Sequence, residues 1–119
     1  MRKVCVITGN RSDYGILREL LKNIQNSDDL ILKLIVTGSH LSPSYGYTIR
    51  EIEEDGLKIH KRIEILLSSD TSIGMSKAMG LSLISFSEAF EEIKPDIILI
   101  LGDRFEIFSA AISALNASI

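Results

Sequence analysis

Cysteine is almost absent from this sequence, whose 119 residues include only Cys5. A lone cysteine excludes a disulfide framework within the chain, which fits a reducing, cytoplasmic location. Because Cys5 lies inside an apolar run, we expect it to be a small buried core residue. The only histidines, His40 and His60, are far apart in the sequence, so with one cysteine they cannot make a zinc site and no metal is expected.

A strong net charge and a long apolar run are also missing. The formal net charge of -3 gives no reason to expect nucleic acid or an anionic membrane as a partner. No stretch approaches the roughly 20 apolar residues of a membrane span. The apolar run at 4–7 is too short for a signal peptide. With 45% hydrophobic and 24% charged residues, the chain has the composition of one ordinary soluble globular domain.

What the sequence does contain is a regular alternation of strand and helix patterns. Apolar runs predict strands at 3–8, 30–37 and 97–101, and a weaker strand within 57–65 that we expect near a sheet edge. After the first strand, Ser12 or Asp13 is expected to cap the first helix. Further helix patterns follow at about 48–55, 73–93 and 105–116. This order predicts an α/β fold, a Rossmann-like doubly wound parallel sheet with strand order 3-2-1-4.

The helix patterns also predict which side chains cover the sheet. The first helix and the long helix each carry an apolar stripe: Ile16, Leu17, Leu20, Leu21 and Ile24 in the first, and Met75, Met79, Leu83, Phe86, Phe90 and Ile93 in the second. Gly56 is expected to end the short helix with a left-handed backbone. The fourth strand would leave an open hydrophobic edge, which natural proteins avoid. We therefore expect residues 1–119 to form a domain truncated before its next strand.

The loop at 8–15 is the first of three that the parallel topology brings to the carboxyl edge of the sheet, where ligands bind. Gly9 permits a tight turn, and the helix that follows offers free N–H groups to an anion, with Arg11 beside them. The loop is neither a GxGxxG fingerprint nor a P-loop. It is either a phosphate contact or a plain turn in which Ser12 and Asp13 cap and Arg11 is solvated.

The second loop, 37–46, contains hydroxyls, a histidine and a tyrosine between Gly38 and Gly46. Ser39 and His40 could hydrogen-bond a polar ligand, whereas a histidine in a polar loop is also commonly solvated or capping. Both interpretations stay open on the sequence alone.

The third loop joins the fourth strand to the last helix through Gly102, Asp103 and Arg104. Asp103 at a strand end could act as a general acid or base, and it could equally be an N-cap. Arg104 and Glu106 could simply be first-turn residues of the helix. No GxSxG nucleophile elbow occurs anywhere in the chain.

Four blocks of the sequence form a set in a fixed order: TGNRSDYG at 8–15, TGSHLSPSYGYT at 37–48, AMGLSL at 78–83 and KPDIILILGDRFE at 94–106. Together they resemble the UDP-N-acetylglucosamine 2-epimerases over nearly the whole chain. The non-hydrolysing branch of that family generally has a GTRPE-type first loop and a GDT-type turn after the fourth strand. The NRSDYG and GDRFE found here therefore resemble the hydrolysing branch.

The resemblance implies the N-terminal half of a GT-B-like two-domain fold, with the active site in the cleft between the halves and a C-terminal UDP-binding domain beyond this chain. The family reaction eliminates UDP across C1–C2 of UDP-N-acetylglucosamine and hydrates the intermediate. It releases UDP and N-acetylmannosamine for sialic-acid-type synthesis. No cofactor is needed, and family members form homo-oligomers. Half of the site would be missing, so the chain alone is expected to be inactive.

The resemblance also assigns roles to residues of the three loops. Asp103 matches the family's catalytic acid/base position, and Arg11 is the cation for the diphosphate. Ser39, His40 and Arg104 are substrate-side contacts, while the loops are shaped by Gly9, Gly38 and Gly102. The alternatives are a non-hydrolysing epimerase, and a stand-alone flavodoxin-like module that binds a nucleotide without catalysis. The sequence also leaves open whether the sugar is UDP-N-acetylglucosamine or a related diacetamido-trideoxy UDP-sugar.

Overall fold

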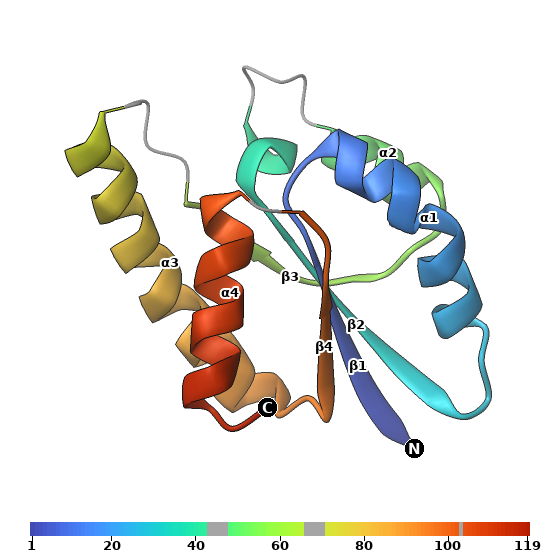
Figure 1. Cartoon of the computed structure of the whole chain (residues 1–119). Coiled ribbons are helices and arrows are strands. Elements are labelled where there is room, and N and C mark those ends of the chain that lie inside the picture. Colours follow the sequence, from blue (N-terminus) through green and yellow to red (C-terminus); the bar gives the residue numbers. More distant parts are fainter. Residues whose placement is uncertain (43–47, 66–70, 103) are drawn as a thin grey trace.

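The computed structural model describes residues 1–42, 48–65, 71–102 and 104–119 and contains a 4-stranded parallel sheet (Figure 1). The strands are β1 (Arg2–Thr8), β2 (Leu30–Thr37), β3 (Ile59–Ile63) and β4 (Ile97–Ile100). Their order is β3-β2-β1-β4, which confirms the predicted fold class and the edge position of the third strand.

The register of the sheet brings the carboxyl ends of its strands to one edge. Val4 of β1 pairs with Leu32 of β2 on one side and with Ile97 of β4 on the other. At the opposite edge of the sheet, the amide of Lys3 donates to the Asp96 carboxylate at 2.7 Å and so fixes the start of β4 against the start of β1. The loops that leave β1, β2 and β4 therefore emerge side by side.

Helices cover both faces of the sheet (Figure 1). On one face lie α1 (Arg11–Gln25) and α2 (Ile49–Glu54), and on the other lie α3 (Ser72–Ile93) and α4 (Phe105–Asn116). A short 3₁₀ turn, η1 (Gly38–Leu41), follows β2 directly. Gly56 has φ +79, so the left-handed end predicted for the short helix is confirmed.

Alternation along the strands produces two separate cores. Cys5 and Ile7 of β1 point toward α3 and α4, whereas Val4 and Val6 point toward α1 and α2. Cys5 is fully buried, as predicted, and burial raises the pKa of its thiol to about 12. Among the helices in the described part of the chain, none has the length and apolar composition needed to cross a membrane.

Some details of the helices differ from the sequence-based expectation. The N-cap of α1 is Asn10, whose side chain accepts from the Asp13 amide, so the predicted cap at Ser12 or Asp13 was wrong. Ile16 and Leu20 of the predicted stripe are exposed, and Tyr14 takes their place in the core. In α3, Phe86, Phe90 and Ile93 are buried as predicted, whereas Met75 is exposed. Small residues such as Ala78 and Ala89 are buried in the interface of α3 instead.

Candidate active site

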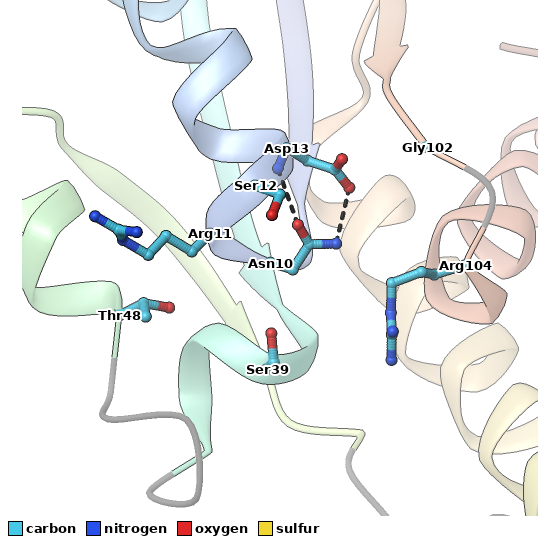
Figure 2. A pocket seen from close by; sticks show the side chains of 8 residues that line it. All are labelled: Asn10, Arg11, Ser12, Asp13, Ser39, Thr48, Gly102 and Arg104. Carbon is cyan, nitrogen blue, oxygen red and sulfur yellow. Dashed lines mark hydrogen bonds between the residues drawn. The ribbon is translucent and has the colours of Figure 1, made fainter.

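A cavity of about 460 Å³ opens at the carboxyl edge of the sheet (Figure 2). Its lining comes from the loops after β1, β2 and β4 and from the start of α2, and consists of Asn10, Arg11, Ser12, Asp13, Ser39, Thr48, Gly102 and Arg104. The three loops that the sequence analysis singled out therefore meet around one space. Within the described ranges, no cluster of His, Cys, Asp or Glu side chains is suited to hold a metal ion.

The first loop is held rigidly by its own polar side chains. Asn10 accepts from the Asp13 amide and donates from Nδ2 to Asp13 Oδ2, both at 2.9 Å (Figure 2). Asp13 in turn lies against Gly102, where φ is +102 and an added Cβ would come within 2.8 Å of Asp13 Oδ2. The start of α1 and the turn after β4 are thus fitted closely together, and glycine is needed at 102.

The second loop is bonded to the first. Both the amide and the hydroxyl of Ser39 donate to the carbonyl of Gly9, at 2.9 and 3.2 Å. Gly38 has φ +64, and a Cβ at that position would lie only 2.5 Å from the same carbonyl oxygen. Gly38 therefore allows the backbones of the two loops to approach closely, which brings Ser39 to the cavity wall.

Arg11 is exposed at one side of the cavity and is anchored at its base. Its Nε lies 2.9 Å from Glu51 Oε2 on α2, and Arg18 reaches Oε1 of the same carboxylate at 2.8 Å. Engagement through Nε leaves the terminal guanidinium nitrogens of Arg11 available to an anion. Sequence reasoning identified Arg11 but missed Glu51, because the pair joins elements that are distant in the chain.

A buried tyrosine ties the two helices on this face together. Tyr14 donates a very short hydrogen bond to Asp55, which lies just after α2, and the Arg18 guanidinium lies 5.5 Å from the centre of the Tyr14 ring. Burial and then the Asp55 bond raise the pKa of Tyr14 to about 12, and the same bond lowers the pKa of Asp55. These contacts fix α2, and with it Glu51, relative to α1.

On the opposite side of the cavity stands Arg104, the residue before α4. Its Nε donates to Glu106 Oε1 at 2.9 Å, and about half of its side chain remains exposed. Figure 2 shows Arg104 on the side of the cavity opposite Arg11, with Asn10 and Ser39 between them. Two arginines on different elements therefore flank the cavity, each held through Nε by a carboxylate.

Comparison with known families gives this geometry its context. The profile of the family described as "UDP-N-acetylglucosamine 2-epimerase" matches residues 22–119. The chain belongs to this family. The family resemblance drawn from the sequence blocks is therefore confirmed, and the cavity is the candidate active site of a family member.

Individual relatives of the chain in this epimerase family have names that specify a substrate and a type of reaction. The chain is 48% identical over 110 residues to "GDP/UDP-N,N'-diacetylbacillosamine 2-epimerase (hydrolyzing)" of Campylobacter jejuni, which covers 92% of this chain and 28% of the relative. It is 43% identical over 119 residues to "UDP-N,N'-diacetylbacillosamine 2-epimerase (hydrolyzing)" of Legionella pneumophila, covering 100% of this chain and 32% of the relative. The chain thus spans about a third or less of the length of these proteins.

Solved structures of the epimerase family share the fold. One titled "Crystal structure of UDP-N-acetylglucosamine 2-epimerase" superposes with a TM-score of 0.85 at 21% identity, covering 99% of this chain and 31% of the other. At this identity the likeness establishes the fold. The sheet order 3-2-1-4 is accordingly that of the N-terminal part of these epimerases.

Among the described residues, the predicted substrate contact His40 is not part of the cavity lining. Asp103 lies outside the described residues, although its sequence neighbours Gly102 and Arg104 both line the cavity. His40 lies beneath it and is fully buried, with Nε2 3.0 Å from the Thr8 hydroxyl and Nδ1 2.7 Å from that of Thr48. In this epimerase-family chain His40 therefore supports Thr48, which does reach the cavity.

The buried imidazole predicts an acid-sensitive stability. Burial lowers the pKa of His40 from an ordinary 6.5 to about 4. The unfolded chain then binds a proton that the folded one does not, so stability falls as the pH drops from 6.5 to 4, by up to about 1.4 kcal/mol per pH unit and roughly 3 kcal/mol in total.

Urea unfolding between pH 7 and pH 4 measures this dependence. His40→Gln, which keeps hydrogen-bonding groups but cannot titrate, should flatten it, whereas the matched change His60→Gln at an exposed position should leave most of it intact. An identical pH profile in wild type and His40→Gln would show that another group is responsible.

Proposed function

We propose that this chain is the N-terminal part of a hydrolysing UDP-sugar 2-epimerase and that its cavity receives the diphosphate and the sugar ring. One observation supports the proposal most directly. In this member of the family, Arg11 and Arg104 flank a cavity that the first residues of α1 also line. Arginine forks and helix N-terminal amides are suited to the negative charge of a diphosphate.

The proposed chemistry is an elimination followed by hydration. A base removes the C2 proton while the C1–O bond to UDP breaks, so charge develops on the leaving diphosphate. Arg11 and Arg104 are placed to stabilise that charge. Water then adds at C1 and a proton returns to C2 on the opposite face, which inverts C2 and gives the free sugar. Asp103 is the proposed acid/base in these proton transfers.

For the substrate, the family resemblance implies UDP-N-acetylglucosamine and leaves a diacetamido-trideoxy UDP-sugar open, while the relatives described above are named for UDP-N,N'-diacetylbacillosamine. Both compounds are UDP-linked sugars with an acetamido group at C2. The diacetylbacillosamine sugar has a second acetamido group that N-acetylglucosamine lacks. The names of the relatives lead us to propose the diacetamido sugar as the first substrate to test. The word "hydrolyzing" in both names supports release of free sugar and UDP over the non-hydrolysing alternative.

The test is NMR of the full-length protein in deuterated water, with each UDP-sugar in turn. Free UDP together with a C2-deuterated, C2-inverted free sugar is the expected result, because the C2 proton exchanges with solvent. A deuterated product still attached to UDP would assign the non-hydrolysing reaction. No deuterium incorporation with either sugar would contradict the proposal and favour a binding module.

The remaining expectations of the resemblance apply to that full-length protein. We propose a second, UDP-binding domain, assembly as a homo-oligomer and a cytoplasmic location. The support for a second domain is the length of the relatives, of which this chain covers 28% and 32%.

A further inference from the structure

Glu106 is a charged side chain in an unusual position. It belongs to the first turn of α4, and it is fully buried. Its Oε1 accepts from Arg104 Nε at 2.9 Å, whereas its Oε2 is buried and has no hydrogen-bond partner among the described residues. An acidic residue in the first helical turn is stabilised by the helix dipole, but that effect does not require burial. Burial of a carboxylate costs free energy unless the carboxylate is paired, so the bond from Arg104 is needed to offset the burial of Glu106.

The carboxylate of Glu106 is enclosed by the two loop glycines. A Cβ on Gly9 would lie 2.8 Å from Glu106 Oε1, and a Cβ on Gly38 would lie 2.9 Å from the same atom. Any side chain at either glycine would therefore displace the carboxylate. Gly9 and Gly38 leave room for Glu106 beneath the cavity, and Glu106 fixes the spacing between the loops after β1 and β2.

The guanidinium of Arg104 is held by this buried anchor. The bond to Glu106 uses Nε, which fixes the plane of the guanidinium and leaves its terminal nitrogens free to make two parallel bonds to an anion. Arg104 lines the cavity, as Figure 2 shows, whereas Glu106 does not. An unanchored arginine would lose more rotational freedom on binding a ligand than one already fixed.

We propose that Glu106 is a positioning residue: from beneath the cavity, its carboxylate orients Arg104 toward the bound diphosphate. The choice of ligand rests on the proposed function, whereas the orientation of Arg104 does not. Because Glu106 acts through Arg104, its removal should weaken substrate binding only while Arg104 is present.

The first test concerns orientation and needs no ligand. In ¹⁵N NMR of the full-length protein, the Arg104 Nε–H signal, assigned by its loss in Arg104→Lys, should exchange slowly with solvent. Glu106→Gln replaces a charge-assisted bond with a weaker neutral one and should speed this exchange by about tenfold or more. The same change at the exposed Glu88, Glu88→Gln, should not alter it. Unchanged exchange in Glu106→Gln would overturn the proposal, even if the protein proves to be an epimerase.

The second test is a double-mutant cycle on turnover. Glu106→Gln should raise KM by about tenfold, because the diphosphate is bound less tightly, with a smaller fall in kcat, because Arg104 then stabilises the leaving charge less well. In an Arg104→Ala background the same change should alter KM by less than about twofold. Equal effects in both backgrounds would show a merely structural role. If wild type turns over no UDP-sugar, the proposed function fails, and the exchange measurement still decides the role of Glu106.

Discussion

Replacing Asp103 by asparagine in the full-length protein is expected to lower kcat by about two to four orders of magnitude, the usual contribution of a general acid or base. Asparagine keeps the size of the side chain but can neither accept nor deliver the C2 proton. The unfolding free energy should change little. Turnover followed by UDP release, with urea unfolding on the same samples, measures both effects.

The matched control for that variant is Asp28→Asn, at an exposed position between α1 and the start of β2, at the edge of the sheet opposite the cavity. It makes the same chemical change and should leave turnover as in wild type. Near-wild-type turnover in Asp103→Asn would refute the assignment of Asp103 and direct attention to Asp13, whose carboxylate lines the cavity.

Gly38→Ala is expected to cost about 3 kcal/mol or more of unfolding free energy, from strain at positive φ and from overpacking. The backbone of Gly38 has φ +64, and an added Cβ would lie 2.5 Å from the Gly9 carbonyl oxygen and 2.9 Å from Glu106 Oε1. The carbonyl cannot simply move away, because it accepts both hydrogen bonds from Ser39. Urea unfolding followed by circular dichroism measures the loss.

Gly80→Ala supplies the comparison for this change. Gly80 lies within α3, and a Cβ there would meet nothing within 4 Å. Alanine in an open helical position should be neutral or stabilise by up to about 1 kcal/mol. Equal stabilities for Gly38→Ala and Gly80→Ala would mean that the loop after β2 adapts, and that the contact with Gly9 is not required.

The topology could be predicted from the sequence because each strand pattern is followed by a helix pattern, and parallel strands then have few possible orders. The finer details of α1 could not. Its buried residues are Tyr14, Leu17, Leu21 and Ile24, a face rotated away from Ile16 and Leu20. The predicted stripe correctly includes Leu17, Leu21 and Ile24, but a count of apolar residues adds Ile16 and Leu20. It also leaves out Tyr14, whose buried hydroxyl is satisfied by Asp55, a partner that no local pattern reveals.

The candidate site was predictable to a similar extent. Sheet topology alone brings Arg11, Ser39 and Arg104 to one edge, and the structure gathers them around one cavity. The burial of His40 depends on Thr8 and Thr48, and that of Glu106 on the two loop glycines. Such contacts between distant segments are set by tertiary packing, so a local sequence pattern cannot distinguish these buried side chains from solvated ones.

The pairing of the first strand with the last also determines the order in which this chain can fold. Lys3 and Asp96, which bond across the start of β1 and β4, are 93 residues apart. During synthesis β1 can pair with β2 early, but its other edge stays open until α3 and β4 have left the ribosome. A sheet closed by such distant contacts forms more slowly than a helical bundle of similar size, because loop-closure entropy must be overcome before the contacts form.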